Sequence, residues 1–568
     1  MLKKGNFFLL NKSRNKFSSR FIYNSFKFTS NDETKTNENK KKVEENKTVE
    51  GVQGKTSSND LIENENNKDV IKKKIDIVQP SYFGYLSGVL TTVWDQFGKK
   101  IDENSISKLT VKKETIPNNN QQYVANTKIS KIIIKNVSRI KVSNLTKMHV
   151  NELLLAQSTG SILLRIQALT SHLQEFRSSR MTAINNHLLI PYLTNLIETG
   201  KDVKIQEEAR KCLSILGYTP FLKSSGIRIL SIDGGGTRGI MGLKVLEAIE
   251  KSAGKKIYEL FDYITGVSTG AIIAVLLGIK KVSVDECRKS YLELSRKLFN
   301  QQKLTGVGSF LISHSFYNTS LWKDILKENV GDTMTLADSA KYKDVPKISI
   351  VSCILNSPQL QPYVFRNYEL PPGHDSQFRG GNNYKLWEVV QASTAAPGYF
   401  EEVRLGSIIH QDGGVLANNP TAIAIHEAKN LWPNEDIQCV VSIGNGRSVS
   451  EVEFSSCDKY FKMAYNKISK IVDSATDSQA THLCINDLLP GEKYFRLNPY
   501  MNFPYSLDEI DNEKLDQMTR DADLYVRRNI KKIEDCSKQL TQKPTFIHLI
   551  KKEAINKFNQ IGIFKNNF

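Results

Sequence analysis

Three glycines at a strand-to-helix junction form the first group of residues that could do chemistry. Gly234, Gly236 and Gly239 follow a β-branched run and open a helical pattern. Unpaired backbone N–H groups at such a junction can hold an oxygen that carries negative charge. The loop could bind a dinucleotide phosphate, because its spacing fits G-x-G-x-x-G, with Glu259 or Asp262 as the ribose contact. It could equally form an oxyanion hole for an ester carbonyl.

A serine between two glycines follows about thirty residues later. Gly266, Ser268 and Gly270 form G-x-S-x-G between a strand-like run and an apolar helical run, which is the context of a nucleophile elbow. Flanking glycines leave room for the sharp, strained turn that presents the hydroxyl. The uncharged stretch 263–279 is at the short limit for crossing a bilayer and is broken by glycines, so we expect a buried helix there. The two segments together favour acyl transfer over nucleotide binding.

An aspartate at the end of a later strand supplies a candidate base. Asp412 follows the strand-like run 407–411 and precedes Gly413 and Gly414. A carboxylate fixed at a strand end can face a cleft, as a general base must. On its own, such an aspartate more commonly caps or turns the chain. Together with the glycine loop and Ser268, however, Asp412 is predicted to act as the base.

The elements that must position these residues alternate between strands and helices. Strand-like runs lie at 346–355, 362–367, 407–411 and 437–444, and helical patterns lie at 283–300, 387–392 and 421–431. Alternating units of this kind predict an α/β domain with a mainly parallel central sheet, which we place at 226–445. The helix end at 393–400 is rich in small residues and allows two backbones to approach closely.

Helical patterns flank this domain on both sides. The N-terminal set comprises 150–157, 161–176, 181–198 and 205–216. It resembles armadillo or HEAT helical pairs, although no clear sequence repeat is present. We place this helical region at 126–220 and expect a short strand at 129–134. Residues 446–568 are predicted to form a mostly helical extension with one long charged helix around 507–540.

The N-terminal part has the composition of a targeting segment followed by a linker. Residues 1–30 hold seven Lys or Arg and no acid, interspersed with aromatic and aliphatic residues. This pattern is typical of a mitochondrial presequence rather than a secretory signal, with a disordered basic tail as the alternative. Residues 31–122 are predicted to be a low-complexity linker. Within it, the uncharged, aromatic-rich segment 80–94 suits either a bilayer surface or packing against the folded domains.

Composition limits the classes of protein and site. The 568 residues carry a net charge of +18, and 40% of them are hydrophobic, which is enough for two or more domains with a large core. The positive balance favours an acidic partner, either anionic lipid or nucleic acid. Seven cysteines without a C-x-x-C pair argue against a disulfide framework. Nine scattered histidines predict no metal site, and we expect no cofactor.

The three signatures taken together resemble those of the patatin-like phospholipases. The matching segments are 233–239 (DGGGTRG), 266–270 (GVSTG) and 412–414 (DGG). Further segments resemble the calcium-independent phospholipase A2 branch of the gamma type. These segments are 226–232, 364–368, 395–400, 475–477 and 494–496. The resemblance runs from about residue 205 to about residue 528.

This resemblance implies a three-layer patatin-like α/β domain and a serine acyl hydrolase that cleaves phospholipid esters without calcium. It implies a Ser–Asp dyad without a catalytic histidine, with Ser268 as the nucleophile and Asp412 as the base. Gly235 and Gly236 would donate N–H groups to the oxyanion, and Arg238 would assist electrostatically. An aspartate with a pKa of about 3.9 is a poor base for an alcohol. We therefore expect a partly desolvated site that raises this pKa.

Three other functions remain open from the sequence. An α/β-hydrolase triad could be completed by His426 or His482, which follow Ser268 and Asp412 in the required chain order. The chain could instead be a catalytically inactive lipid-binding scaffold. A nucleotide-binding enzyme is the third alternative, because the glycine loop also fits that pattern.

The expected partner is a phospholipid membrane surface, with no role for nucleic acid. Basic residues on both sides of 80–94 and the positive balance predict peripheral, salt-sensitive docking on anionic membranes. The basic residues of 1–30 favour mitochondria, as does the sequence Lys565 to Phe568, which differs from a peroxisomal Ser-Lys-Leu signal. Endoplasmic reticulum and peroxisomal membranes are the alternatives.

Overall fold

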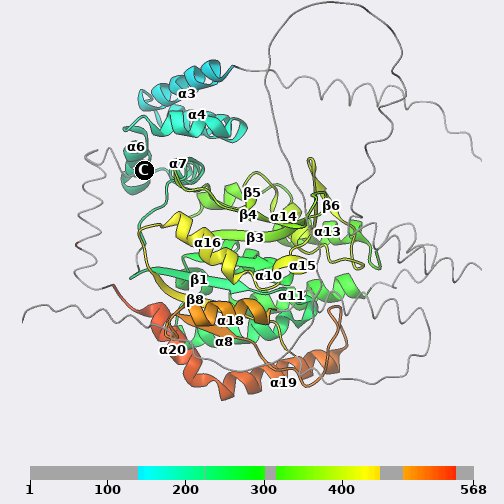
Figure 1. Ribbon diagram of the computed structural model, residues 1–568. Coiled ribbons are helices and arrows are strands. Elements are labelled where there is room, and N and C mark those ends of the chain that lie inside the picture. The colour runs from blue at the N-terminus through cyan, green and yellow to red at the C-terminus, as the bar shows by residue number, and fades with distance from the viewer. Residues whose placement is uncertain (1–137, 223, 301–314, 448–477, 545–549, 551–568) are drawn as a thin grey trace, which may run out of the picture. The chain divides into compact units, whose positions relative to one another are not determined.

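The structure is a computed structural model that describes residues 138–222, 224–300, 315–447, 478–544 and 550 (Figure 1). The presequence expected at 1–30, the linker at 31–122 with its segment 80–94, and the strand expected at 129–134 lie outside the described residues. Segment 475–477 lies outside them as well. Among the described helices, none combines the length and apolar character that crossing a bilayer requires.

A nine-stranded sheet lies at the centre of the α/β region (Figure 1). Its strands are β1 Ile227–Ile232, β2 Tyr263–Val267, β3 Lys347–Ile354, β4 Gln361–Arg366, β5 Arg379–Gly381, β6 Val403–Leu405, β7 Ile408–Asp412, β8 Ile437–Ile443 and β9 Tyr494–Leu497. The main path runs β5-β4-β3-β2-β1-β8-β9, and β7 pairs with β3 and β6. β1, β2, β3, β8 and β9 pair in parallel, whereas β4 and β7 run antiparallel to β3. The prediction of a mainly parallel sheet is confirmed.

Helices cover both faces of this sheet. They are α8 Gly239–Ala253, α9 Ile257–Leu260, α10 Thr269–Ala274, α11 Val284–Phe299, α13 Thr319–Val330, α14 Leu386–Ser393, α15 Gly414–Ala417, α16 Thr421–Leu431, α18 Gln479–Leu488, α19 Asn512–Arg528 and α20 Ile530–Thr541. Short 3₁₀ turns lie at η4 Gly236–Arg238 and η6 Ala337–Lys341, and a π-helical turn, η5 Val275–Ile279, continues α10. The predicted three-layer α/β architecture is confirmed.

The central strands are apolar on both sides, as strands buried between two helical layers must be. In β1, Leu230 and Ile232 belong to the large cluster that includes residues of α8, α10 and α14. Ile227 and Ile229 belong to a second cluster, which includes residues of α16. Every residue of 263–279 except Ser268 is buried. This stretch is therefore β2 followed by a buried helix.

Residues 138–222 form the helical region. Its helices are α3 Arg139–Leu154, α4 Thr159–Glu175, α5 Arg180–Ile184, α6 Leu189–Thr199 and α7 Val203–Leu216, with the 3₁₀ turn η3 Arg177–Ser179 before α5. Buried apolar side chains from all these α-helices form one cluster. Helix α7 ends at Gly217, whose φ of 81° lies in the left-handed region that glycine adopts without strain.

Two predictions for the helical region are wrong. The pattern at 150–157 is only the last part of a longer helix, because α3 already begins at Arg139 behind the capping residue Ser138. The single helix predicted at 181–198 is two helices, α5 and α6. Between them, the Asn186 side chain accepts a hydrogen bond from a nearby backbone N–H group. Asparagine side chains compete with the helix for such groups and so favour a break.

The long charged helix predicted around 507–540 is also two helices, α19 and α20. Asn529 separates them, because its backbone leaves the helical conformation (φ −114°, ψ 21°). The prediction that this helix packs with one solvated face holds for both helices, since Leu515, Met518 and Ala522 of α19 pack in a small apolar cluster. In α20 the same pattern recurs. Its buried residues Ile533, Cys536 and Leu540 belong to the main core.

Candidate active site

Strand β3 brings Ser268 and Asp412 to the same edge of the sheet. Along this edge, Val351 pairs with Val267, the last residue of β2. The next residue, Ser352, pairs with Asp412, the last residue of β7. Ser268 directly follows Val267. The register of three strands therefore places two residues that are 144 positions apart in the sequence side by side.

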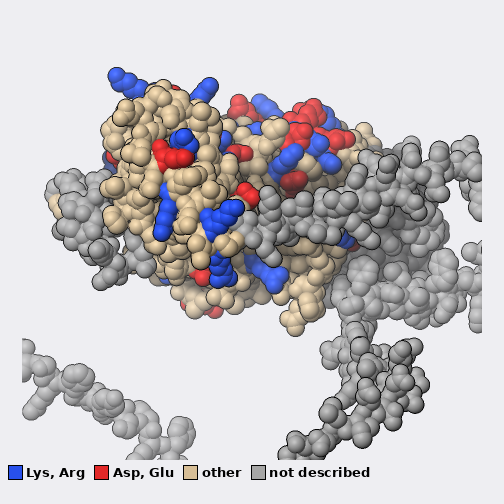
Figure 2. Space-filling model, turned by 90° about the horizontal axis from the view of Figure 1, so that it is seen from above, with Lys and Arg blue, Asp and Glu red and all other residues tan. Residues whose placement is uncertain are grey.

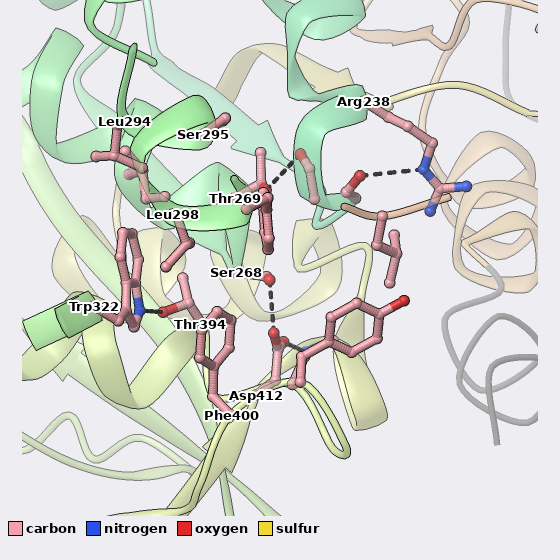
Figure 3. Close-up of a pocket in the computed structure, with 18 of the residues that line it drawn as sticks. Arg238, Ser268, Thr269, Leu294, Ser295, Leu298, Trp322, Thr394, Phe400 and Asp412 are labelled. Carbon is pink, nitrogen blue, oxygen red and sulfur yellow. Dashed lines mark hydrogen bonds between the residues drawn. The ribbon is translucent and has the colours of Figure 1, made fainter. Parts of the chain in front are cut away.

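Ser268 occupies a strained turn between β2 and α10. Its φ of 53° and ψ of −123° lie outside the regions that non-glycine residues favour, at a cost of about 1–3 kcal/mol. Its hydroxyl donates to Asp412 Oδ2 at 2.6 Å (Figure 3). A Cβ at Gly266 would lie 2.1 Å from Gly270 O, and a Cβ at Gly270 would lie 2.3 Å from Ile232 O. The turn has the geometry of a nucleophile elbow, and its close approaches require both glycines.

Asp412 is buried, and its two carboxylate oxygens have separate partners. Oδ2 accepts from Ser268, and Oδ1 accepts from Gly414 N at 2.7 Å. Burial raises the pKa of this carboxyl to about 6, and the hydrogen bonds from Ser268 and Gly414 offset only part of that rise. A Cβ at Gly413 would lie 2.4 Å from Val351 O, so glycine is needed beside the aspartate. A higher pKa makes the carboxylate a stronger base.

The glycine loop presents unpaired N–H groups to the same pocket as Ser268 and Asp412. Gly235 and Gly236 line this pocket, and no acceptor for their N–H groups lies in the described part of the chain. Gly234 N instead donates to a backbone carbonyl at 3.2 Å. The loop conformation needs glycine, since Gly236 has a φ of 55°. The two free N–H groups can receive the charge that develops on an ester carbonyl oxygen.

Arg238 braces the loop rather than facing the serine hydroxyl. Its Nε donates to Gly235 O at 3.1 Å, and Figure 3 shows the guanidinium turned away from Ser268. The assistance predicted for Arg238 is therefore not a direct contact in this geometry. Gly239 begins α8, and a Cβ there would lie 2.4 Å from Thr269 Cγ2. The last glycine of the G-x-G-x-x-G pattern thus allows α8 and α10 to pack closely.

Three polar residues that the sequence did not single out hold the serine and the loop in place. Ser393 Oγ accepts from Ser268 N at 2.9 Å. Tyr291 OH and Thr269 Oγ1 both donate to Gly236 O, the second at 2.8 Å. The small-residue helix end gave a signal for Ser393, whereas nothing in the sequence pointed to Tyr291.

A buried ion pair supports the start of the glycine loop. Arg496 donates through Nη1 and Nη2 to the two carboxylate oxygens of Asp233, at 3.0 and 2.6 Å. Asn445 Nδ2 donates to Asp233 O at 2.6 Å. Arg496 belongs to a segment that resembles the family, but the sequence alone does not show that it pairs with Asp233.

The two histidines of the alternative triad lie outside the pocket. His426 Nε2 accepts from Gln377 N at 3.1 Å. His482 Nδ1 lies 3.2 Å from Tyr494 OH. Neither histidine is among the residues that line the pocket. The geometry therefore offers neither as the third member of a triad.

The residues expected to bind a ribose are engaged elsewhere. Asp262 Oδ1 accepts from Arg228 Nη2 at 2.8 Å. Glu259 Oε2 accepts from Lys256 N at 2.9 Å in a helix cap. Neither carboxylate lines the pocket beside the glycine loop. The ribose contact that dinucleotide binding to this loop would require is therefore not supplied by either carboxylate.

An apolar pocket opens beside Ser268 (Figure 3). Including its open mouth, it has a volume of about 780 Å³. Its apolar lining residues are Ile272, Leu294, Leu298, Phe299, Trp322, Ala396, Pro397, Tyr399, Phe400, Val415 and Leu507. Such a lining suits an aliphatic chain. In the described ranges, no group of three or more His, Cys, Asp or Glu side chains is placed to hold a metal ion.

The chain matches one protein family and several named relatives. Residues 230–425 match the family model described as patatin-like phospholipase. The chain is 37% identical over 474 residues to the calcium-independent phospholipase A2-gamma of Mus musculus, with 83% of this chain and 60% of that protein covered. The protein of the same name from Homo sapiens is 40% identical over 419 residues, with 73% and 53% covered.

A plant relative is more distant. The protein named phospholipase A I of Arabidopsis thaliana is 31% identical over 396 residues, with 59% of this chain and 30% of that protein covered. The chain thus spans 60% or less of the length of these three relatives. The predicted resemblance to the patatin-like phospholipases is confirmed.

Proposed function

We propose that the chain, whose residues 230–425 match the patatin-like phospholipase model, is a calcium-independent serine acyl hydrolase of membrane glycerophospholipids. It would cleave fatty-acyl esters as a phospholipase A2 or A1, and would also accept lysophospholipids. The observation that carries this proposal is the 2.6 Å hydrogen bond from Ser268 Oγ to Asp412 Oδ2, beside two unpaired N–H groups. The names of the relatives, which contain the word phospholipase, support the substrate class.

The geometry fits a two-step reaction through an acyl-enzyme. Ser268 Oγ attacks the ester carbonyl carbon while Asp412 Oδ2 takes its proton. The N–H groups of Gly235 and Gly236 stabilise the resulting oxyanion, each by roughly 3–4 kcal/mol. When the tetrahedral intermediate collapses, the alcohol of the lysophospholipid leaves with the proton from Asp412. Water then attacks the acyl-enzyme with Asp412 again as the base, and the fatty acid is released.

The apolar pocket supplies the binding energy for one acyl chain. Each methylene that leaves water for such a lining contributes about 0.8 kcal/mol. Trp322 Nε1 donates to Thr394 Oγ1 at 2.9 Å, which fixes the indole in the pocket wall. The substrate is therefore recognised mainly through its chain, and its ester is placed beside Ser268.

A fluorophosphonate probe tests the nucleophile. We expect stoichiometric labelling of the full chain in the presence of a calcium chelator, and loss of labelling in Ser268→Ala. Asp412→Ala should react much more slowly, because its serine lacks a base. His426→Ala and His482→Ala serve as matched controls and should keep most labelling and most ester hydrolysis. Dependence on either histidine would support the triad, and an unlabelled wild type would support an inactive scaffold.

We also propose that the protein acts as a peripheral protein on mitochondrial membranes. On the face shown in Figure 2, basic and acidic side chains are interspersed in the described part, so the net charge of +18 is not gathered there. The proposal instead rests on the basic residues of 1–30 and those beside 80–94. A fluorescent fusion of the full chain should colocalise with mitochondria, and replacing the seven Lys and Arg of 1–30 by Gln should abolish this. An endoplasmic reticulum or peroxisomal pattern would overturn it.

A further inference from the structure

A second cavity lies at the C-terminal side of the sheet, between β9 and helices α18, α19 and α20. Including its open mouth, it has a volume of about 950 Å³. Its lining residues are Arg447, Gln479, His482, Arg496, Asn498, Tyr500, Asn502, Asp521, Leu524, Tyr525, Arg528, Asn529 and Lys532. None of them lines the pocket beside Ser268. The proposed hydrolysis does not use this cavity.

The lining of this cavity carries more positive charge than its single acid can balance. Arg447, Arg528 and Lys532 form no ion pair with any carboxylate in the described ranges. The one acidic residue, Asp521, is buried and already accepts from Asn502 and Gln517 side chains. Three cationic groups therefore face the same space without an anion.

Two buried donors in the cavity wall also lack an acceptor. Arg447 Nε and Arg496 Nε are buried, and neither has a hydrogen-bond partner among the residues that the structure describes. Buried N–H groups in proteins are almost always paired, so an orphaned one marks a place where an acceptor would bind. The remaining guanidinium atoms of Arg496 are held by Asp233, and Arg447 lies over the Tyr500 ring at 3.9 Å. Both guanidinium groups are thus fixed before any ligand arrives.

We propose that this cavity is a phosphate-binding site, in which Arg447, Arg528 and Lys532 hold the phosphate group of a soluble monoester or of a lipid headgroup. A guanidinium offers two parallel N–H donors that match phosphate oxygens, and an ammonium adds a compact positive charge. Three unbalanced cations suit a dianion better than a carboxylate. Arg528 and Lys532 are exposed, so they lie where a ligand can enter.

Lys532 keeps hydrogen-bond donors that a phosphate could use. Its Nζ donates to Arg496 O at 2.8 Å and therefore keeps further donors for a ligand. Although the residue is exposed to solvent along part of its length, desolvation lowers the pKa of its ammonium, and the charges of Arg447 and Arg496 lower this pKa further. A bound phosphate would reverse this effect, because it would place negative charge among the three cations.

Binding is best measured with the full chain carrying Ser268→Ala, because this variant should not hydrolyse vesicles. The soluble probes are inorganic phosphate and glycerol 3-phosphate, titrated by calorimetry at low ionic strength. The lipid probes are phosphatidylcholine vesicles with and without phosphatidic acid, followed by flotation. Arg528→Gln and Lys532→Gln should each weaken binding by about tenfold or more. Arg528→Lys should recover part of the lost affinity, since lysine keeps the positive charge but lacks the two parallel N–H donors of the guanidinium.

Arg520→Gln is the matched control, because Arg520 lies on the same helix as Arg528 and bonds Gln517 outside the cavity. It should change affinity by less than about twofold. Saturable binding of glycerol 3-phosphate that depends on Arg528 assigns a soluble ligand. Binding confined to vesicles with phosphatidic acid, with the same dependence, assigns a lipid headgroup. Equal affinity in all variants with unchanged thermal melting, or no binding to any probe, would overturn the proposal, and neither outcome bears on labelling of Ser268.

Discussion

Asp412 combines two properties that oppose each other. Its carboxylate must be ionised to accept the proton of Ser268, yet only 5% of the residue is exposed. Burial raises its pKa to about 6, although Ser268 and Gly414 donate hydrogen bonds that favour the charged form. The same burial that makes the carboxylate a stronger base therefore makes its charge more costly to hold.

The rate of ester hydrolysis should report this pKa directly. We expect kcat/KM to fall about tenfold for each pH unit below about 6, because a protonated Asp412 cannot accept the proton of Ser268. Above pH 7 the profile should be flat with respect to this group. A water-soluble monomeric ester avoids changes in vesicle charge during the measurement. An acid limb centred near pH 4 would contradict the burial argument.

Removing the charge of Asp412 should stabilise the protein while it abolishes turnover. The folded-state pKa of about 6 lies above the ordinary value of 3.8, so the folded state binds more protons between these values. The ionised carboxylate then costs up to about 3 kcal/mol at neutral pH, and this cost disappears as the pH falls below about 4. Asp412→Asn should raise the free energy of unfolding accordingly at pH 7.5. Urea unfolding of the wild type and of Asp412→Asn at pH 7.5 and below about pH 4 measures this difference in the free energy of unfolding. A difference that is the same at both pH values would contradict the proposed cost of the buried charge.

At the level of single residues, the sequence predicts only those site residues that stand in a recognisable local pattern. Ser268 and Asp412 each stand at a strand end beside glycines, and that pattern can be read without coordinates. Ser393, whose hydroxyl accepts from Ser268 N, lies 125 residues away, and the small-residue helix end that contains it does not reveal this contact. The contact exists only because α14 packs on β3, which tertiary packing decides. Arg238 does stand in a recognisable motif, but the motif does not show that its guanidinium group bonds Gly235 O.

At the element scale, strand β3 organises the site. The periodicity of the sequence predicts β2, β3 and β7 as strands, but it contains no information on which edges pair. The antiparallel pairing of β7 with β3 begins where the parallel pairing of β2 ends. The breaks at Asn186 and Asn529 are likewise hidden, because the apolar helical pattern continues across both. At both positions the asparagine side chain bonds a nearby backbone group, and such bonds compete with the helix.

Helix α11 should affect turnover through a single hydroxyl. Tyr291 OH donates to Gly236 O and so helps to aim the N–H groups of the glycine loop. Thr269 Oγ1 remains as a second donor, so Tyr291→Phe should preserve the loop but loosen it. We expect kcat to fall about tenfold and KM to change by less than about twofold, because the loop acts on the transition state. Steady-state kinetics on a short-chain ester measures both constants.

Tyr317→Phe is the matched control for this positioning role. Tyr317 is also buried, and its hydroxyl donates to Asp508 rather than to the glycine loop. Losing a buried hydrogen bond should cost each variant about 1–3 kcal/mol of stability, whereas only Tyr291→Phe should lower kcat. Equal kcat values for the two variants would show that Tyr291 has a purely structural role.

At the scale of the whole molecule, the helical region and the α/β domain share buried polar contacts. The hydroxyl of Ser214 in α7 donates to Asn367 O at 3.1 Å, and the backbone carbonyl of Ser214 accepts from Glu369 N at 3.0 Å. Residues on both sides of the domain boundary predicted near 220 therefore form hydrogen bonds with each other's backbone groups. Composition and periodicity cannot reveal this, because α7 has the same helical pattern whether it packs alone or against a sheet.

Arg180 allows a test of these contacts between the helical region and the α/β domain. Its side chain is 18% exposed and donates to Glu369, to Leu216 O at 3.2 Å and to Leu370 O at 2.7 Å. Arg180→Gln would leave the carboxylate and two carbonyls under-satisfied, so the free energy of unfolding should fall by about 2–4 kcal/mol. Arg177 also pairs with Glu369, but its side chain is 54% exposed. Arg177→Gln should therefore cost no more than about 1 kcal/mol.

The two variants also distinguish one cooperative unit from two independent ones. If the shared contacts couple the helical region to the α/β domain, Arg180→Gln should shift a single urea transition, because neither part keeps its buried partners when the other unfolds. Fluorophosphonate labelling of Ser268 should then disappear at the same urea concentration as helical circular dichroism. Labelling that outlasts a first loss of helix would mean that the α/β domain folds without α3 to α7. Equal costs for Arg180→Gln and Arg177→Gln would show that burial of the ion pair does not hold the two parts together.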